Sequence, residues 1–397
     1  MNIVKKLYYV HLQYYENGKI AYPGVKKKIE GQLSIFKSSG YDTCEVEINV
    51  KKINKLIKRM PGVSGLYDWE SIIDKIKEPN IVYLRHVYLD LGYIDFLKKL
   101  KSLYPQLIVL VEFPTFPYEK ERFPLRGVKA FLDYPFFVKD RFYRKKLYKY
   151  VDRIVTYSED ENIFGVPTIN VQNGLDITSV QVVNPTQHDQ DANENVNKTI
   201  KEPINLIAVA SLQEYHGYER IFEGIKQYYE KNGTRRIIFH VVGSGDIEND
   251  LKELVDNLGI SDYVIFYGSK TGDELTDIFN KSDIGIGSFG FYKIGLERAS
   301  SLKTREYLAR GLPVISGCRQ DIFEVSPCKY HMEFSNDNTP VDIQKIIDFY
   351  DELYAGKKKI DVFKEIRKYA EENVTMQKAF APVMSYLDDR LSGESFS

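Results

Sequence analysis

The sequence has few cysteines, little net charge and no long apolar run, and each of these absences excludes a class of protein. Its three cysteines, Cys44, Cys318 and Cys328, are too few and too scattered for a disulfide framework. The formal net charge of -1 gives no basic field of the kind that holds nucleic acid. We therefore expect a reducing compartment and no nucleic-acid partner.

Membrane-crossing and metal-binding signals are also missing. No stretch approaches the ~20 apolar residues that a transmembrane helix needs. The opening MNIVKKLYYVHLQYYENG has a basic pair but no apolar run before a small-residue cleavage site, so we expect no signal peptide. No Cys/His cluster has zinc-ligand spacing, and we predict neither a metal site nor a cofactor. These features favour a cytoplasmic protein.

The remaining composition is that of a folded protein with more than one core. Hydrophobic residues make up 43% of the 397 residues and charged residues 28%. A chain of this length is too long for one ordinary core, which predicts two domains of just under about 200 residues each. A segment rich in Asn, Asp and Gln, bounded by Pro185 and Pro203, reads as an exposed linker.

Short apolar runs alternate with helical patterns on both sides of that linker. In the first half the predicted strands are residues 7–12, 81–87, 107–113, 152–158 and 168–174, with helices at 25–37 and 93–103. In the second half the strands are 204–210, 236–243, 263–268, 283–289 and 312–317, with helices at 218–229, 247–258, 273–280 and 302–310. Buried strands alternating with helices predict an α/β fold with parallel, doubly wound sheets.

Two such Rossmann-like domains would face each other across a cleft. The predicted boundaries are residues 1–183 for the first domain, 184–203 for the linker and 204–372 for the second domain. A last helical pattern within 373–397 would cross back to lock the two domains. In doubly wound sheets, ligands bind at the carboxyl ends of the strands.

The stretch SLKTREYLARGLPVI, from Ser301 to Ile315, is the strongest candidate site. Lys303, Arg305 and Glu306 stand at the start of its helix, where backbone amides favour a phosphate. Cations are disfavoured there unless an anion is present. The simpler interpretation is that these charged side chains lie on the solvent-exposed side of the first helical turn and bind no ligand.

A second, weaker signal is VVGSGD, in which Gly243 opens a glycine-rich turn between a strand and a helix. Two glycines permit a tight turn and close backbone approach to a ligand. The third glycine of a dinucleotide fingerprint is missing, so an ordinary strand-to-helix turn explains the motif equally well.

Together with their order along the chain, these motifs resemble retaining glycosyltransferases of the GT-B fold, family 4 and its bacterial polysaccharide relatives. SLQEYHGYERIFEGI resembles the first turn of the donor domain, and VVGSGD resembles its Val-Gly-x-Gly turn. YVIFYGSKTGDEL resembles the loop that contacts the base, and NGLD resembles the motif that closes the acceptor domain. GVKKKIEGQLSIFKSSG and LVEFPTFPYEKE resemble acceptor-domain features.

The resemblance implies a role for each matching residue. Glu306 would bind the ribose, and Lys303 and Arg305 would face the diphosphate or the sugar. Gly24 would approach the phosphates across the cleft, with Gly243 in the glycine-rich turn.

Two departures from the family pattern concern the phosphates and the sugar. Ser211 and His216 stand where the family usually has an arginine and a lysine. Arg298 stands where many members have the first of two glutamates, with Glu297 one position away. Lys303, Arg305 and Arg298 are the candidates to replace the missing cations.

Glu112 is the candidate catalytic acid or base, because it lies at the carboxyl end of the strand LIVLVEF. A polar residue that merely closes a strand is an equally good interpretation.

The run from Arg122 to Tyr150 is both basic and aromatic. That combination suits an anionic membrane surface or a lipid-diphosphate acceptor. An amphipathic helix that buries its aromatic side chains in the domain explains it at least as well.

The resemblance thus implies a retaining glycosyltransferase that needs no metal. It would move a sugar from a UDP- or GDP-linked donor to a glycan or a polyprenyl-diphosphate-linked acceptor in capsule, exopolysaccharide or lipopolysaccharide assembly. We expect it in the cytoplasm, at the inner face of the plasma membrane if peripheral. The alternatives are a catalytically silent GT-B partner subunit, a glycan-binding protein, or a nucleotide-sugar epimerase.

Overall fold

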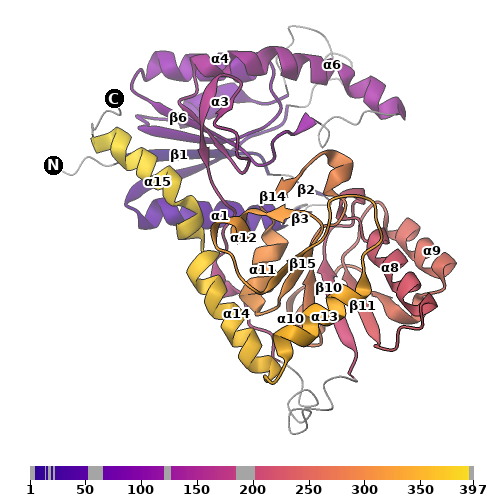
Figure 1. Cartoon of the computed structure of the whole chain (residues 1–397). Helices are drawn as coiled ribbons and strands as arrows, with labels where there is room; N and C mark the ends of the chain where they lie inside the picture. The colour runs from indigo at the N-terminus through magenta and orange to yellow at the C-terminus, as the bar shows by residue number, and fades with distance from the viewer. Residues whose placement is uncertain are drawn as a thin grey trace. The chain divides into compact units, whose positions relative to one another are not determined.

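The chain forms two compact units in the computed structural model (Figure 1). Unit 1 comprises Met1–Gln172 and Ala379–Ser397, and unit 2 comprises Asn173–Lys378. The structure describes residues 5–13, 15–16, 19–20, 23–51, 66–119, 127–184 and 202–392; the side chains of 15, 16, 19, 20, 23 and 127–133 lie outside the description. Most of the predicted linker, 185–201, lies outside the described residues, as does the start of the basic run, 122–126.

Unit 1 is built on a seven-stranded sheet in the order β4-β1-β5-β6-β7-β9-β8. Its strands are β1 (Lys5–His11), β4 (Tyr41–Glu47), β5 (Ile81–Arg85), β6 (Ile108–Phe113), β7 (Arg153–Thr156), β8 (Asn162–Ile163) and β9 (Val166–Asn170). All neighbours are parallel except β8 and β9. The antiparallel pair β2 (Tyr15–Glu16) and β3 (Lys19–Ile20) stands apart from this sheet.

Helices cover both faces of the unit 1 sheet. One apolar cluster packs beneath α3 (Trp69–Lys75), α4 (Leu91–Leu103), α6 (Gly127–Tyr143) and the 3₁₀ helix η1 (Arg144–Lys149). The other cluster packs beneath α1 (Pro23–Ser38) and α15 (Met376–Ser392). Figure 1 shows α4 and α6 on one side of this sheet, with α1 and α15 on the other. The last helix of the chain therefore completes the core of the first unit.

Unit 2 contains a six-stranded parallel sheet in the order β12-β11-β10-β13-β15-β17. Its strands are β10 (Ile204–Val209), β11 (Ile237–Val242), β12 (Val264–Phe266), β13 (Ile284–Ile286), β15 (Val314–Ser316) and β17 (His331–Glu333). A separate parallel pair joins β14 (Arg298–Ala299) to β16 (Arg319–Gln320).

The helices of unit 2 follow its strands in alternation. They are α8 (Glu219–Glu230), α9 (Glu248–Leu258), α10 (Gly272–Phe279), α11 (Leu302–Arg310), α12 (Asp321–Val325), α13 (Ile343–Tyr354) and α14 (Lys359–Asn373). Short 3₁₀ helices are η2 (Ile177–Ser179), η5 (Glu214–His216), η6 (Ser261–Tyr263) and η7 (Phe291–Ile294). In chain order the sheet reads 3-2-1-4-5-6, which is the Rossmann arrangement. The predicted doubly wound α/β class is confirmed.

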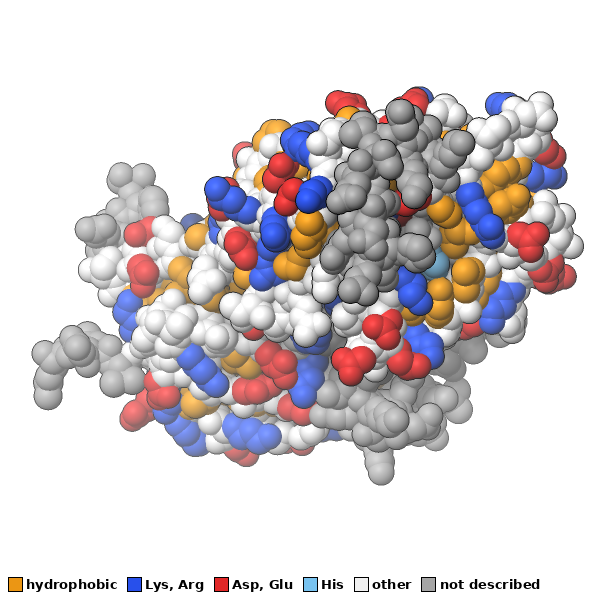
Figure 2. Space-filling view, turned by 90° about the horizontal axis from the view of Figure 1, so that it is seen from below, with side chains coloured by type: hydrophobic (Ala, Val, Ile, Leu, Met, Phe, Trp, Pro, Cys, Tyr) orange, Lys and Arg blue, Asp and Glu red, His pale blue; other side chains and the backbone are white. Residues whose placement is uncertain are grey.

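Helix hydropathy and the charges on one face of the molecule complete the description of the fold. None of the described helices is both long and apolar enough to span a bilayer. On the face drawn in Figure 2, acidic and basic side chains are interspersed, as the formal net charge of -1 leads one to expect.

Candidate functional site

The turn between β10 and α8 lies at the carboxyl end of the central strand of unit 2, where Rossmann-like sheets bind ligands. Two glycines hold it against the loop after β13. Gly217 has a φ of +64°, and a Cβ there would lie 2.4 Å from the backbone nitrogen of Gly290. The Phe289 N–H donates to the His216 carbonyl at 2.7 Å. The two loops are thus fixed against each other by backbone contact.

His216 is buried within this turn and is electrically neutral. Burial, with a further contribution from the charge of Lys303, lowers its pKa to about 2. Its Nδ1 accepts a hydrogen bond from the Gln213 N–H at 3.1 Å, so the ring proton resides on Nε2. The imidazole therefore keeps an N–H donor on Nε2, which suits a phosphate oxygen.

Lys303, in the first turn of α11, lies beside this imidazole. Its Nζ donates to the Tyr218 Oη at 3.3 Å, and the Tyr218 ring stacks on His216 with centroids 5.4 Å apart. No carboxylate of the described residues lies within ion-pair distance of this ammonium. Burial lowers the pKa of Lys303 to about 7. An anionic ligand would supply the counter-charge that the surrounding residues lack.

Helix α11 begins at Ser301, whose Oγ accepts from the Thr304 N–H at 3.5 Å. Glu306 lies one turn after Lys303 and is partly exposed. Its Oε1 accepts from the Arg310 Nη2 at 2.9 Å, an ordinary pair of residues four apart. Among the described residues no hydrogen bond to its Oε2 is seen, which is compatible with the predicted ribose contact.

Arg305 points in another direction. Its side chain is fully buried, and Nη2 donates to both carboxylate oxygens of Asp321 at 2.8 and 2.9 Å. Nη1 donates to the Ser301 carbonyl at 3.2 Å. The guanidinium therefore fastens α11 to the start of α12, and we leave Arg305 out of the proposed donor contacts.

The other predicted replacement cation is also engaged. Arg298 Nε donates to Glu324 Oε2 at 2.5 Å, so its charge is balanced within β14 and α12. Ser211 is exposed at the end of β10 and carries no charge. Lys303 is thus the cation that this cluster contributes, assisted by the neutral donor His216.

The glycine-rich turn after β11 packs against the chain itself. Gly243 has a φ of +125°, and a Cβ there would lie 1.7 Å from the Ala210 carbonyl oxygen. A Cβ on Gly245 would lie 2.2 Å from the Leu212 carbonyl oxygen, and the Leu212 N–H donates to Ser244 at 3.0 Å. Both glycines therefore set the position of the 210–212 turn, which leads into His216.

Gly24, in unit 1, lies in the first turn of α1 and not in a loop before the helix, as the sequence pattern had indicated. It is exposed, and a Cβ there would meet nothing within 4 Å. The packing of unit 1 does not require a glycine at this position, so the predicted approach of a phosphate stays a prediction.

Glu112, at the carboxyl end of β6, is fully buried in a polar cluster. Lys28 Nζ lies 3.1 Å and Arg85 Nη1 3.5 Å from its Oε1. Three neutral side chains donate hydrogen bonds to it, namely Gln32, Tyr83 and Tyr157. Burial alone would raise the pKa of Glu112, but the two cations outweigh it and hold the pKa at about 2.

A carboxylate with that pKa stays ionised at neutral pH and is a weak base, so it is poorly suited to general acid–base catalysis. Glu112 instead joins α1 to the strands β5 and β6. We assign it to the framework of unit 1.

Three contacts around the cluster could not be read from motif positions. Tyr218 links His216 to Lys303, and its only sequence signal is its place two residues after the histidine. Asn173, from the NGLD motif, donates through its backbone to Ser300 Oγ at 2.8 Å, directly before α11. Arg220 donates to the Phe289 carbonyl at 2.7 Å and so holds the loop that touches His216.

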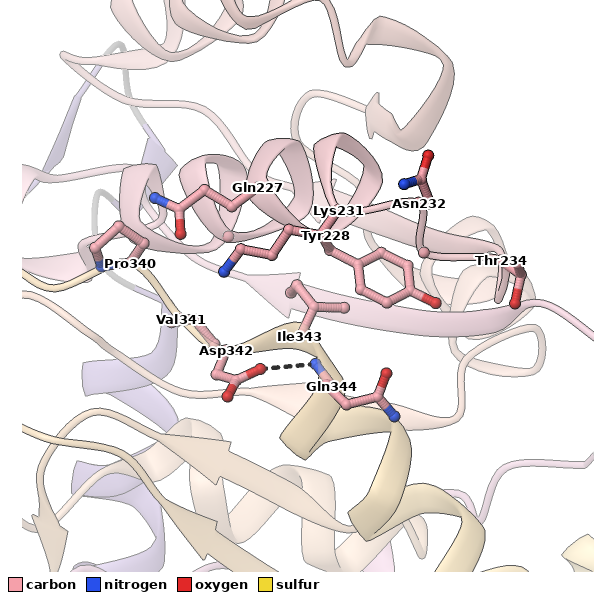
Figure 3. Close-up of a pocket in the computed structure, with 12 residues that line it drawn as sticks. Gln227, Tyr228, Lys231, Asn232, Thr234, Pro340, Val341, Asp342, Ile343 and Gln344 are labelled. Atoms are coloured by element: carbon pink, nitrogen blue, oxygen red, sulfur yellow. Dashed lines mark hydrogen bonds between the residues drawn. The ribbon is translucent and has the colours of Figure 1, made fainter.

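A separate cavity of about 530 Å³ lies between the C-terminal half of α8 and the start of α13. Figure 3 shows Gln227 and Tyr228 of α8, with Lys231 directly after the helix, on one side of the cavity, and Asp342, which accepts from the Gln344 N–H at 3.0 Å, on the other. This cavity is at the opposite end of α8 from His216 and Tyr218. It contributes nothing to the cluster at Lys303.

Comparison with known proteins finds a family model that matches part of unit 2. Residues 189–320 match the family described as Glycosyl transferases group 1. Mannosylfructose-phosphate synthase from Agrobacterium fabrum is 25% identical over 137 residues, 33% of this chain and 29% of that protein. The match therefore spans less than a third of that relative's length.

Solved structures resemble the whole chain. Sucrose-phosphate synthase from Thermosynechococcus elongatus superposes with a TM-score of 0.60 at 14% identity, covering 98% of this chain and 100% of that one. The Anabaena protein HepE, solved in complex with UDP, gives 0.61 at 10% identity, covering 97% and 100%.

These likenesses show that the chain has the GT-B fold. More particularly, it contains a glycosyltransferase group 1 domain, which includes β10, α8, β11 and the cluster residues His216, Tyr218 and Lys303.

Proposed function

We propose that the chain is a retaining glycosyltransferase that transfers a sugar from a nucleotide-diphosphate donor bound in unit 2. The observation that carries this proposal is the cluster of Lys303, Tyr218 and His216 at the carboxyl end of β10, inside the group 1 domain. It offers one cation that has no carboxylate partner in the described part of the chain, and one neutral N–H donor, beside a helix N-terminus. All three features favour a diphosphate.

The same residues suit the chemical step. When the bond between the sugar and the nucleotide breaks, negative charge grows on the departing diphosphate. Donors that are already oriented toward that position stabilise the developing charge. Lys303 and the Nε2–H of His216 would supply this stabilisation, and Glu306 would hold the ribose diol.

Calorimetry with UDP-glucose and GDP-mannose tests the site. We expect one of the two to bind, and Glu306→Ala to weaken that binding ~10–150-fold, the value of a hydrogen bond to a charged group. Glu253→Ala, on the exposed side of α9, is the matched control and should bind as the wild type does. Unchanged binding and turnover in Glu306→Ala would refute the assignment.

The same calorimetry identifies the nucleotide base of the donor. HepE, which shares the fold of this chain, was solved in complex with UDP, and this favours a UDP-linked donor. We propose UDP first and GDP second.

The proposed acceptor is a glycan or a polyprenyl-diphosphate-linked saccharide, in capsule, exopolysaccharide or lipopolysaccharide assembly. The resemblance of α1 and the segment after β6 to acceptor domains of polysaccharide enzymes supports this choice. The corresponding location is the cytoplasm, at the inner face of the plasma membrane. Transfer of radiolabelled sugar to a membrane lipid extract, with loss of label on mild acid, is the expected result.

A catalytically silent GT-B subunit is the second candidate. Ser211 and the neutral His216 favour it, because they leave the cluster with a single cation. Absence of donor binding at millimolar nucleotide sugar would select this candidate. Release of an epimerised nucleotide sugar without any acceptor would instead indicate an epimerase.

A further inference from the structure

The segment formed by α6 and η1 exposes a stripe of large apolar side chains. Tyr134, Val138 and Phe142 are 62%, 47% and 59% exposed, and Tyr148 is 56% exposed. Positions 134, 138 and 142 are spaced four apart and so share one face of the helix. Together these four side chains make up half of the exposed large hydrophobic residues in the described part of the chain.

The opposite face of the same segment is firmly packed. Tyr143 and Leu147 are buried in the core beneath α4. The Tyr88 Oη donates to the Phe136 carbonyl at 2.6 Å, and the Tyr118 Oη donates to Asp140 at 2.6 Å. The segment is therefore anchored through one face, and the apolar stripe is left on the other.

Cations surround this stripe. Arg141, Lys145 and Lys149 are exposed and Lys146 is partly exposed. Lys146 Nζ lies 4.8 Å from the centroid of the Phe142 ring. Between residues 134 and 150 the one acidic residue is Asp140, which is buried.

Two basic residues of the run do not belong to this surface. Lys139 is buried, and Arg144 forms an ion pair with Glu119 at 2.6 Å. The basic side chains that this segment leaves at its surface are therefore the four at 141, 145, 146 and 149. This sorting of inward and outward residues could not be made from the sequence.

We propose that this surface, composed of Tyr134, Val138, Phe142, Tyr148 and the four cations, docks onto an anionic lipid bilayer. Aromatic and aliphatic side chains enter the boundary between headgroups and acyl chains, and neighbouring cations meet anionic headgroups. Each cation near such a surface raises the affinity about fivefold. A nucleic acid would use the cations but leave the apolar stripe exposed, so a bilayer satisfies both halves of the surface.

The proposed docking rests on the proposed function in one respect. A lipid-linked acceptor would lie in the bilayer that unit 1 contacts. The surface itself is defined by exposure and charge, and its binding can be measured without any donor or acceptor.

Vesicle co-sedimentation of the full chain is the test. Vesicles of equal parts phosphatidylglycerol and phosphatidylcholine should pull down the wild type, and pure phosphatidylcholine should retain far less. Lys145→Glu/Lys149→Glu should lower the partition coefficient at least about 25-fold, because two cations are lost. Phe142→Ser should lower it on both vesicle types.

Matched controls lie on α4 of the same unit. Lys98→Glu/Lys99→Glu and Leu103→Ser change exposed residues of the same kinds and should bind vesicles as the wild type does. Circular dichroism of each variant checks folding. If the wild type stays in the supernatant with anionic vesicles, or if the surface variants sediment like it, the proposal is overturned.

A dimer that dissociates on Phe142→Ser, together with absent vesicle binding, would assign the surface to a second copy and would also overturn it. UDP-glucose binding should be unchanged in all of these variants. If the wild type binds vesicles but no nucleotide-sugar donor, the proposed function is refuted and the proposed docking surface is retained.

Discussion

Three cations near the first turn of α11 have different surroundings, although the sequence presents them alike. Arg305 is neutralised by Asp321 and Arg298 by Glu324, while among the described residues Lys303 is hydrogen-bonded to the hydroxyl of Tyr218 and to no carboxylate. The two acidic partners follow their arginines by 16 and 26 residues. No local pattern connects residues so far apart, so the sequence could not show which of the three cations has an acidic partner.

Lys303 should make donor binding depend on pH. Burial lowers its pKa from 10.5 to about 7, and a diphosphate binds the protonated form. The affinity for UDP should therefore be highest below about pH 7 and fall up to tenfold per pH unit above it. Calorimetry at several pH values checks this expectation.

The free energy of unfolding should change in the opposite sense without ligand. Between about pH 7 and 10.5 the unfolded chain holds the Lys303 proton and the folded chain does not, so this residue's contribution to stability rises with pH. Lys303→Met should remove this residue's part of both dependences. Lys252→Met, an exposed lysine of α9, should keep it. An affinity for UDP that falls above pH 7 as steeply in Lys303→Met as in the wild type would contradict the assignment.

Arg305 and Asp321 should behave as a structural pair. Removing one partner leaves a buried charge uncompensated, and Asp321→Asn should cost about 3–5 kcal/mol of unfolding free energy. Arg305→Met/Asp321→Leu should restore most of that loss, because both charges are then gone. Hydrogen exchange of α11 peptides reports the change. If Asp321→Asn keeps the wild-type protection from hydrogen exchange but no longer binds UDP, Arg305 would instead be assigned to the ligand contacts.

At the scale of elements, helices and strands with a strong hydrophobic pattern were predicted correctly, and a strand with a weak pattern was missed. The helix predicted at 302–310 coincides with α11, and the strands predicted at 81–87 and 107–113 overlap β5 and β6 closely. The edge strand β4 was missed, because Tyr41–Glu47 is polar and mostly unburied. Its place in the sheet comes from pairing with β1, a long-range contact that residue patterning does not contain.

The turn after β11 should be intolerant of a side chain. Gly243→Ala would place a Cβ 1.7 Å from the Ala210 carbonyl oxygen at a φ of +125°, so the 210–212 turn must move. We expect UDP binding to fall at least tenfold, since this turn leads to His216. Gly259→Ala is the control: its φ is +68°, but a Cβ would meet nothing within 4 Å. It should cost only about 1–2 kcal/mol of strain and leave binding intact. Equal binding by both variants would be the contrary result.

At the scale of the whole molecule, the chain returns to its first unit at its end. Phe380, Val383 and Leu387 of α15 are fully buried against the face of the unit 1 sheet that α1 also covers. Unit 1 is therefore completed only after unit 2 has been made. The sequence pattern predicted a returning helix, whereas its partners on the sheet follow from the fold.

Phe380→Ala should destabilise unit 1 selectively. The ring lies 5.6 Å from Phe36 and 5.9 Å from Tyr83, centroid to centroid, and its loss should cost about 3–5 kcal/mol. Trp69, the single tryptophan, lies in the core of unit 1, so its fluorescence during urea unfolding reports on that unit alone. Ser385→Ala, exposed on the same helix, should leave the midpoint unchanged.

Hydrogen exchange in β10, β11 and α11 follows unit 2 in the same experiment. If the two units unfold independently, Phe380→Ala lowers the Trp69 midpoint and leaves the protection of these peptides and the affinity for UDP as in the wild type. An equal loss of protection in unit 2 would mean that α15 couples both units into one cooperative body. In that case mutations in unit 1 would change donor binding through stability, and variants of unit 2 would need to be compared at equal folded fraction.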